Sequence, residues 1–179
     1  VAGHATYIEV RLEADGYRVE WSDVRAAVTP RTRMVVINTP HNPTGTILRQ
    51  ADLDALVAIV QDTQILVLSD EVYEHIVFDG RQHLSLLTRP SLAARSFVVS
   101  SFGKTLHCTG WKVGYCVAPP ALTTEFRKVH QFVQFAVAAP MQAALARFLG
   151  ECPQHARELA QFYQHKRDRF CRLLAGTAL

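Results

Sequence analysis

Short apolar runs alternate with amphipathic segments along this sequence. Five segments are predicted strands, because they either alternate in polarity or are rich in β-branched residues: 6–13, 33–38, 64–69, 96–100 and 113–118. Four segments place apolar residues at helical spacing and are predicted helices: 22–28, 50–62, 120–149 and 154–175. The first helix is expected to take Ser22 as its N-cap, and the last is expected to stop at Gly176.

The order of these elements predicts an α/β fold. Strands that alternate with helices form a mostly parallel sheet flanked by helices. The link between 96–100 and 113–118 is too short for a helical crossover, so these two strands are expected to pair antiparallel. No internal repeat, low-complexity tract or flexible linker interrupts the sequence. We therefore expect a mixed, mostly parallel sheet.

Composition narrows the class of protein. Hydrophobic residues make up 49% of the 179 residues, as in an ordinary globular protein. The net charge of +3 is spread without a run of Lys and Arg, so nothing indicates binding to nucleic acid. No apolar stretch reaches the roughly 18 residues of a membrane helix. The four cysteines form no CxxC pair and no zinc-like cluster, which indicates reduced thiols, a cytoplasmic protein and no metal site.

Polar side chains follow three of the predicted strands. They are Asn42 in the loop PHNPTG, Asp70 with Tyr73, and Ser101 with Lys104. In open α/β sheets, ligands bind beyond the carboxyl ends of the strands. The sequence therefore predicts a ligand site built from the loops that carry these side chains.

Lys104 and Asp70 indicate the chemistry that such a site could perform. A lysine held near a pocket can lose its proton and attack an aldehyde as an amine nucleophile. A carboxylate at the end of a buried strand, such as Asp70, can keep the ring nitrogen of pyridoxal phosphate protonated, so that the ring accepts electrons. Taken alone, Lys104 also fits a solvated surface lysine, and Asp70 also fits the N-cap of a helix over DEVYEHIVF.

Four further residues fit the same cofactor. Tyr73 and Asn42 could donate hydrogen bonds to its phenolic oxygen, and Ser101 and Lys112 could hold its phosphate. Each also has an ordinary structural alternative: Tyr73 as a packing residue, Asn42 as an Asx-turn residue, and the other two as loop residues. Together, the six residues indicate this cofactor more strongly than any one of them alone, because they occur in sequence where the predicted strands end.

Three stretches closely resemble class I/II aminotransferases of the fold type I superfamily, which depend on pyridoxal phosphate. They are NTPHNPTG at 38–45, SDEVYEHIVFDG at 69–80 and SSFGKTLHCTGWKVGYCVAP at 100–119. Within the family they look most like the methionine, kynurenine and glutamine aminotransferases. The resemblance implies a three-layer large domain over 1–150, incomplete here, and a helix over 151–179 that leads toward a C-terminal small domain.

The resemblance also implies a role for the residues around the cofactor ring. Lys104 is expected to form the Schiff base with the cofactor and then to move the proton during catalysis. Asp70 is expected to pair with the ring nitrogen. Asn42 and Tyr73 are expected to bind the phenolic oxygen.

The same resemblance extends to the phosphate and to the parent enzyme. Ser101 is expected to bind the phosphate, and Lys112 stands where most of the family, although not this subgroup, has an Arg. The family's phosphate-cradling glycine turn and its carboxylate-binding Arg have no counterpart, so the chain is interpreted as a fragment that is inactive alone. The parent enzyme is expected to be a homodimer that transfers an amino group between an amino acid and a 2-oxo acid.

Other interpretations fit less well or stay open. SFGK at 101–104 matches the SxxK motif of penicillin-binding proteins, but the partner motifs SDN and KTG do not follow. A P-loop would need Gly at position 98, where Val98 stands. His41 and His107 lie near the predicted site and are left unassigned. Two alternatives remain open: a C–S lyase of the same cofactor and fold, and an aminotransferase-like domain of a transcriptional regulator.

Overall fold

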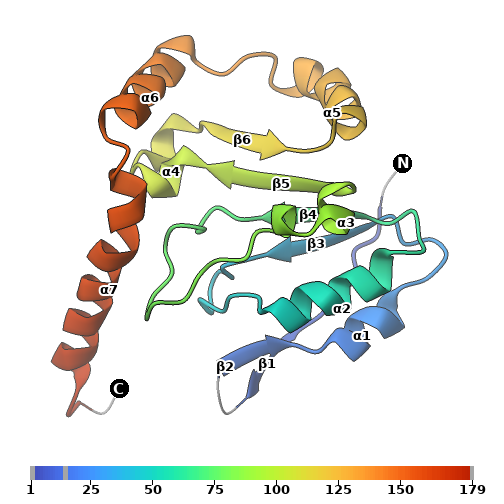
Figure 1. Cartoon of the computed structure of the whole chain (residues 1–179), viewed down its shortest axis with the longest axis horizontal. Coiled ribbons are helices and arrows are strands. Elements are labelled where there is room, and N and C mark those ends of the chain that lie inside the picture. Colours follow the sequence, from blue (N-terminus) through green and yellow to red (C-terminus); the bar gives the residue numbers. More distant parts are fainter. Residues whose placement is uncertain (1–2, 14–15, 178–179) are drawn as a thin grey trace.

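A four-stranded mixed sheet forms the centre of the structure, a computed structural model that describes residues 3–13 and 16–177 (Figure 1). The strands lie in the order β3 (Met34–Asn38), β4 (Leu66–Asp70), β5 (Ser96–Ser101) and β6 (Gly114–Val117). The first three are parallel, whereas β6 pairs antiparallel with β5. The predicted α/β class, the mixed sheet and the antiparallel last pair are therefore confirmed.

Helices flank this sheet on both faces. They are α1 (Trp21–Ala27), α2 (Gln50–Val60), α3 (Pro90–Ala93), α4 (Phe102–Thr105), α5 (Pro120–Val133), α6 (Ala139–Glu151) and α7 (His155–Leu174), with 3-10 turns η1 (Leu86–Thr88) and η2 (Thr109–Trp111). Successive side chains of a strand point to opposite faces. Val98 of β5 belongs to the core that α1 and α2 cover, whereas Phe97 packs on Phe126 of α5, with ring centroids 6.2 Å apart. The sheet thus separates two helical layers.

The core lies between the sheet and α2. Leu53, Leu56 and Val60 are at most 1% exposed and line one face of α2, against the fully buried Val67 of β4. Burial of each such side chain stabilises the fold by about 1.5–3 kcal/mol. The Arg95 guanidinium donates to the Val60 carbonyl oxygen and so holds the end of α2 beside the sheet. This packing holds α2 against β4.

The N-terminal region differs from the prediction. Only Val10–Glu13 of the segment 6–13 forms a strand, β1, which pairs antiparallel with β2 (Gly16–Val19). The second strand was missed because this hairpin is largely exposed and lacks a regular apolar face. The N-cap of α1 is Glu20 and not Ser22, because the Glu20 carboxylate accepts a hydrogen bond from the Ser22 backbone N–H at 3.1 Å.

The single helix predicted at 120–149 is wrong, since two helices occupy this region. α5 ends at Val133 and α6 begins at Ala139. Between them, Phe135 has a left-handed φ of 61°, which a continuous right-handed helix does not allow. Pro140 lies in the first turn of α6. Backbone N–H groups in the first turn have no partner within the helix, so the missing N–H of proline costs no hydrogen bond there.

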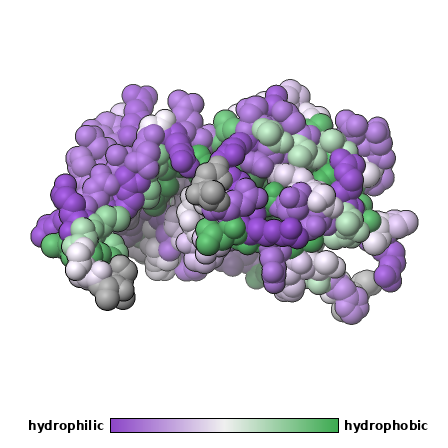
Figure 2. All heavy atoms as spheres, turned by 90° about the horizontal axis from the view of Figure 1, so that it is seen from below, coloured by the Kyte–Doolittle hydropathy of each residue, from purple (hydrophilic) through white to green (hydrophobic). Residues whose placement is uncertain are grey.

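Helix α7 runs along one side of the molecule and binds the loop that follows β4 (Figure 1). Arg167 donates to both carboxylate oxygens of Asp79 at 2.6 and 2.7 Å, and Gln164 accepts from the Asp79 backbone N–H at 2.8 Å. One face of the molecule is mainly hydrophilic, with hydrophobic side chains in small groups (Figure 2). Within residues 3–13 and 16–177, no helix combines the length and apolar character needed to cross a membrane. The division between 1–150 and 151–179 stays a prediction.

Candidate active site

Asn38 joins the ends of two neighbouring strands. It lies directly beside Asp70 in the parallel pairing of β3 with β4, and its Nδ2 donates to the Asp70 carbonyl oxygen at 3.0 Å. The Thr39 backbone N–H donates to the same oxygen at 2.9 Å. The loop that follows β3 therefore starts at a fixed position relative to Asp70.

Asn42 is held in this loop through its backbone. Its N–H donates to Asn38 Oδ1 at 2.7 Å, and the loop is closed by a hydrogen bond from the Gly45 N–H to the His41 carbonyl oxygen at 2.7 Å. Gly45 has φ 71°, a conformation that glycine adopts at little cost. Within the described residues, the Asn42 side-chain amide makes no hydrogen bond, so it does not close its own loop as an Asx turn would.

Asp70 ends β4 and is half-buried. One of its carboxylate oxygens accepts from the Val72 backbone N–H at 3.1 Å. The following residues form turns and not a helix, so the alternative interpretation of Asp70 as a helix N-cap is wrong. Hydrogen bonds within these turns, including one from the Ile76 N–H to the Tyr73 carbonyl oxygen at 2.8 Å, keep Tyr73 close to the end of β4.

Tyr73 and Lys104 meet in a cavity of about 530 Å³. The Lys104 Nζ lies 5.7 Å from the centroid of the Tyr73 ring, a cation–π contact, and both side chains are half-buried. Lys104 is carried by the short helix α4, which packs closely on η2. A Cβ atom at Gly103 would lie only 2.9 Å from the Thr109 Cα, so glycine is required beside the lysine. This packing holds the Lys104 backbone in place.

Ser101 and Lys112 lie beside this cavity without lining it. Ser101 is the N-cap of α4: its Oγ accepts from the Gly103 N–H at 3.0 Å and donates to the Val113 carbonyl oxygen at 3.2 Å. Lys112, which directly precedes Val113, is exposed and has a left-handed φ of 54°. The structure thus places both residues at one end of the site, next to the start of β6.

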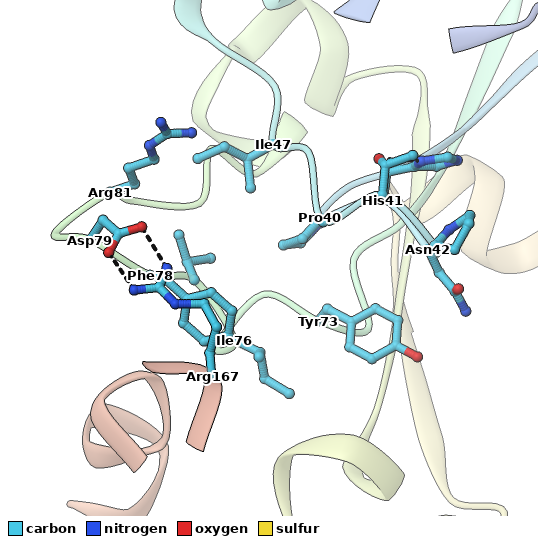
Figure 3. Close-up of a pocket in the computed structure, with 14 residues that line it drawn as sticks. Pro40, His41, Asn42, Ile47, Tyr73, Ile76, Phe78, Asp79, Arg81 and Arg167 are labelled. Atoms are coloured by element: carbon cyan, nitrogen blue, oxygen red, sulfur yellow. Dashed lines mark hydrogen bonds and ion pairs between the residues drawn. The ribbon is translucent and has the colours of Figure 1, made fainter. Parts of the chain in front are cut away.

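A second cavity, of about 490 Å³, adjoins the first at Tyr73. It is also lined by Asn42, and the Tyr73 hydroxyl and the Asn42 amide point to the same side (Figure 3). The ion pair between Asp79 and Arg167 lies at the other end of this cavity (Figure 3). Hydrogen bonds from Arg167 hold the pKa of Asp79 below its usual value, so this carboxylate is charged at neutral pH. Tyr73 therefore lines both cavities, one together with Asn42 and the other together with Lys104.

The two histidines left unassigned take different positions. His41 lines the second cavity, and its Nδ1 is hydrogen-bonded to Thr44 Oγ1 at 2.8 Å. His107 lines the first cavity together with Lys104, has φ 56°, and makes an edge-on contact with the ring of Tyr163 on α7. Helix α7 therefore forms one wall beside the lysine.

Two carboxylates near the site were not singled out from the sequence. Glu71 is buried immediately after Asp70, and Glu74 follows Tyr73 and accepts hydrogen bonds from neighbouring strands. The sequence does contain an indication for Glu71, because this carboxylate stands directly beside Asp70 at the end of a buried apolar run. For Glu74 no local signal exists, since only the folded chain shows its partners.

Comparison with known proteins decides the family. The sequence profile described as "Aminotransferase class I and II" matches residues 2–178. The chain belongs to this family. A methionine aminotransferase from Escherichia coli (strain K12) is 50% identical over 157 residues, which are 88% of this chain and 41% of that protein. A kynurenine–oxoglutarate transaminase from Dictyostelium discoideum is 35% identical over 167 residues, which are 91% of this chain and 38% of that protein.

Solved structures agree with this aminotransferase assignment. The chain matches YbdL from Escherichia coli, whose structure and reactivity identify a methionine aminotransferase function, with a TM-score of 0.87 and 49% identity. The match covers 92% of this chain and 43% of that one. The chain thus spans about two fifths of the length of the relatives that it matches, at 38 to 43%.

Proposed function

We propose that the full-length protein to which this chain belongs is a pyridoxal-phosphate-dependent aminotransferase that acts on an amino acid and a 2-oxo acid. The observation that carries the proposal is the shared cavity of Lys104 and Tyr73, with Asp70 and Asn42 held on the adjoining strand ends. The family assignment and the names of the relatives support the same reaction class.

The polar groups of the site fit the cofactor. Within the described residues, the Tyr73 hydroxyl, the Asn42 side-chain amide and Lys104 Nζ make no hydrogen bond or ion pair, and Lys104 Nζ lies over the Tyr73 ring. Polar groups near a cavity gain from a partner, because leaving them unpaired on burial is costly. A ligand with an aldehyde, a phenolic oxygen and a ring nitrogen would satisfy all of them together with the second oxygen of Asp70.

Each residue would then hold one part of the cofactor. Lys104 would bind its aldehyde carbon, Asp70 its ring nitrogen, and Asn42 and Tyr73 its phenolic oxygen. When bound, pyridoxal phosphate withdraws electrons from the α-carbon of an amino acid. Once the amino group of the substrate had displaced it from the aldehyde carbon, Lys104 would be a free amine that takes the proton from that α-carbon and returns it at the C4′ atom.

The phosphate would lie at the end of the site that holds Ser101 and Lys112. The Ser101 hydroxyl proton is engaged by the Val113 carbonyl oxygen, so it would turn from that oxygen to donate to the phosphate. Lys112 would add a point charge without the two-pronged geometry of an arginine. The exposure of Lys112 leaves its side chain room to reach an anion at this position.

The substrate is proposed from the relatives. One is named a methionine aminotransferase and another a kynurenine–oxoglutarate transaminase, which supports methionine or kynurenine as amino donor. Glutamine and aromatic amino acids are added as donors because the motifs resemble that subgroup. We further propose a cytoplasmic homodimer. The test is a panel of these donors with several 2-oxo acids, with product amino acids and released thiols both measured. Amino-group exchange supports the proposal, whereas release of methanethiol, ammonia and 2-oxobutanoate from methionine without exchange would make the protein a C–S lyase.

A further inference from the structure

Glu71 is a deeply buried carboxylate between two residues of the proposed site. It directly follows Asp70, comes two residues before Tyr73, and is only 1% exposed. A buried charge is costly unless hydrogen bonds compensate for its lost hydration. The side chain therefore requires partners, and the structure supplies three of them.

These partners come from two segments, the strand β4 and the stretch 83–86. Glu71 Oε1 accepts from the Ser69 hydroxyl at 2.9 Å and from the Leu86 backbone N–H at 3.1 Å. Its Oε2 accepts from His83 Nε2 at 2.8 Å, and the His83 side chain is itself only 8% exposed. Burial alone would raise the pKa of Glu71, but hydrogen bonds from His83 and from the Leu86 N–H outweigh it and lower the pKa, so the group stays charged.

Glu74 anchors the other side of Tyr73. Its Oε1 accepts from the Ser100 hydroxyl at 2.9 Å and from the Tyr115 hydroxyl at 2.7 Å, which ties it to β5 and β6. The Glu74 backbone N–H donates to the Glu71 carbonyl oxygen at 2.9 Å, so the two anchors are also joined to each other. Tyr73 thus lies between two fixed points.

Neither carboxylate lines the cavities that contain Lys104 and Asn42. Both therefore act on the site indirectly, through the segments that they hold in place. Replacing a buried charge network by apolar residues is often neutral for stability, so stability alone does not explain why a carboxylate stands at position 71.

We propose that Glu71 is a positioning residue, whose buried hydrogen bonds fix the segment 70–74 so that Tyr73 faces Lys104 and Asp70 is held at the end of β4, with Glu74 as the second anchor. This inference rests on the proposed function for its effect on catalysis. The anchoring itself depends only on contacts within the described residues.

The test uses the full-length enzyme with Glu71→Leu, Glu71→Gln and Tyr73→Phe. Because a displacement of about 1 Å can cost about 100-fold in rate, Glu71→Leu is expected to lower kcat by about 100-fold with a smaller change in KM. The apparent pKa of the visible absorption of the bound cofactor should shift in the same direction as in Tyr73→Phe. Glu71→Gln keeps the shape and, through its remaining oxygen, the contacts with the Ser69 hydroxyl and the Leu86 N–H, while its amide N–H can donate to a neutral His83 ring. This variant should restore most of kcat and the absorption.

A milder matched pair covers the case in which Glu71→Leu does not fold. Ser69→Ala removes one hydrogen bond to Glu71, whereas Ser96→Ala removes an equally buried serine hydroxyl that donates to the Leu92 carbonyl oxygen at 2.7 Å. Ser69→Ala should lower kcat by about fivefold and Ser96→Ala should leave it unchanged, since one hydrogen bond is worth about 1 kcal/mol. Equal kcat and equal absorption in the two variants would overturn the proposal.

Hydrogen exchange separates this inference from the proposed function. The Val72 and Glu74 backbone N–H groups, which donate to Asp70 Oδ1 and to the Glu71 carbonyl oxygen, should exchange faster in Ser69→Ala than in Ser96→Ala. Hydrogen exchange can be measured even if the wild-type protein transfers no amino group. Such inactivity would contradict the proposed function but not the positioning role. Equal exchange at both amides would overturn the positioning role.

Discussion

The Asn38 side chain donates to the Asp70 carbonyl oxygen at 3.0 Å and thereby links the two loops that carry Asn42 and Tyr73. The Oδ1 atom of the same Asn38 side chain accepts a hydrogen bond from the Asn42 backbone N–H at 2.7 Å. One side chain thus sets the distance between residues that lie 28 positions apart in the sequence, from 42 to 70. This relationship is internal to the chain and can be tested by substitution.

Asn38→Ala should destabilise the protein and loosen the site. The change removes two hydrogen bonds at a half-buried position, so the free energy of unfolding should fall by about 1–2 kcal/mol. Denaturant unfolding measures this loss. Gln142→Ala is the control, because it removes an exposed amide that donates to the Val137 carbonyl oxygen. A loss no larger than that of the control would contradict the linking role.

Lys112→Gly should weaken cofactor binding without harming the fold. The change removes the charge proposed to hold the phosphate, and a charge-assisted contact of about 1.5 kcal/mol corresponds to about tenfold in Kd. Because Lys112 has a left-handed φ of 54°, glycine also relieves strain of about 1 kcal/mol at this position. Cofactor titration and thermal unfolding measure the two effects.

Two controls separate the charge of Lys112 from its conformation. Lys112→Met should weaken binding as much as Lys112→Gly but without the gain in stability. Lys128→Met removes a lysine that pairs with Glu125 on the surface of α5, and it should leave cofactor binding unchanged. Pyridoxal without its phosphate should bind equally well to all of these proteins. If Lys112→Gly weakened pyridoxal as much as pyridoxal phosphate, the phosphate role would be wrong.

The Asp79–Arg167 ion pair should give stability a defined pH dependence. Hydrogen bonds from Arg167 lower the pKa of Asp79 in the folded protein. A group with a lowered folded pKa contributes fully above its unfolded pKa, and this contribution is lost as the pH falls through the folded value. An NMR titration of the Asp79 carboxyl group should therefore show a midpoint below that of an ordinary aspartate, and Arg167→Met should move it back up. An unchanged midpoint in Arg167→Met would show that the pair does not set this pKa.

Much of the fold follows from local patterns because its core elements are regular. Helix α2 places Leu53, Leu56 and Val60 on one buried face, and β4 and β5 are short apolar runs between loops. The break between α5 and α6 was missed although Pro140 marks a helix start, because apolar residues at helical spacing continue through the connection. The hairpin β1–β2 was missed because exposed strands carry little burial pattern.

Individual residues of the candidate site could be proposed from the sequence, but the hydrogen bonds that hold them in place could not. Asn42, Asp70, Tyr73 and Lys104 stand at strand ends, and their positions along the sequence indicate a shared edge of the sheet. The buried contacts of Glu71 join residues that are up to 15 positions apart, such as the bond from the Leu86 N–H, and no local pattern encodes them. Such contacts depend on how the loops fold over the strand ends.

Borohydride reduction followed by peptide mass spectrometry tests the central claim most directly. The proposed cofactor attachment predicts that the reduced full-length enzyme carries a pyridoxyl group on the peptide that contains Lys104. It also predicts that Lys104→Ala loses both this adduct and amino-group transfer, because no other amine of the described residues lines the same cavity. An adduct on another lysine, or a Lys104→Ala protein with a reducible adduct and full activity, would contradict the account.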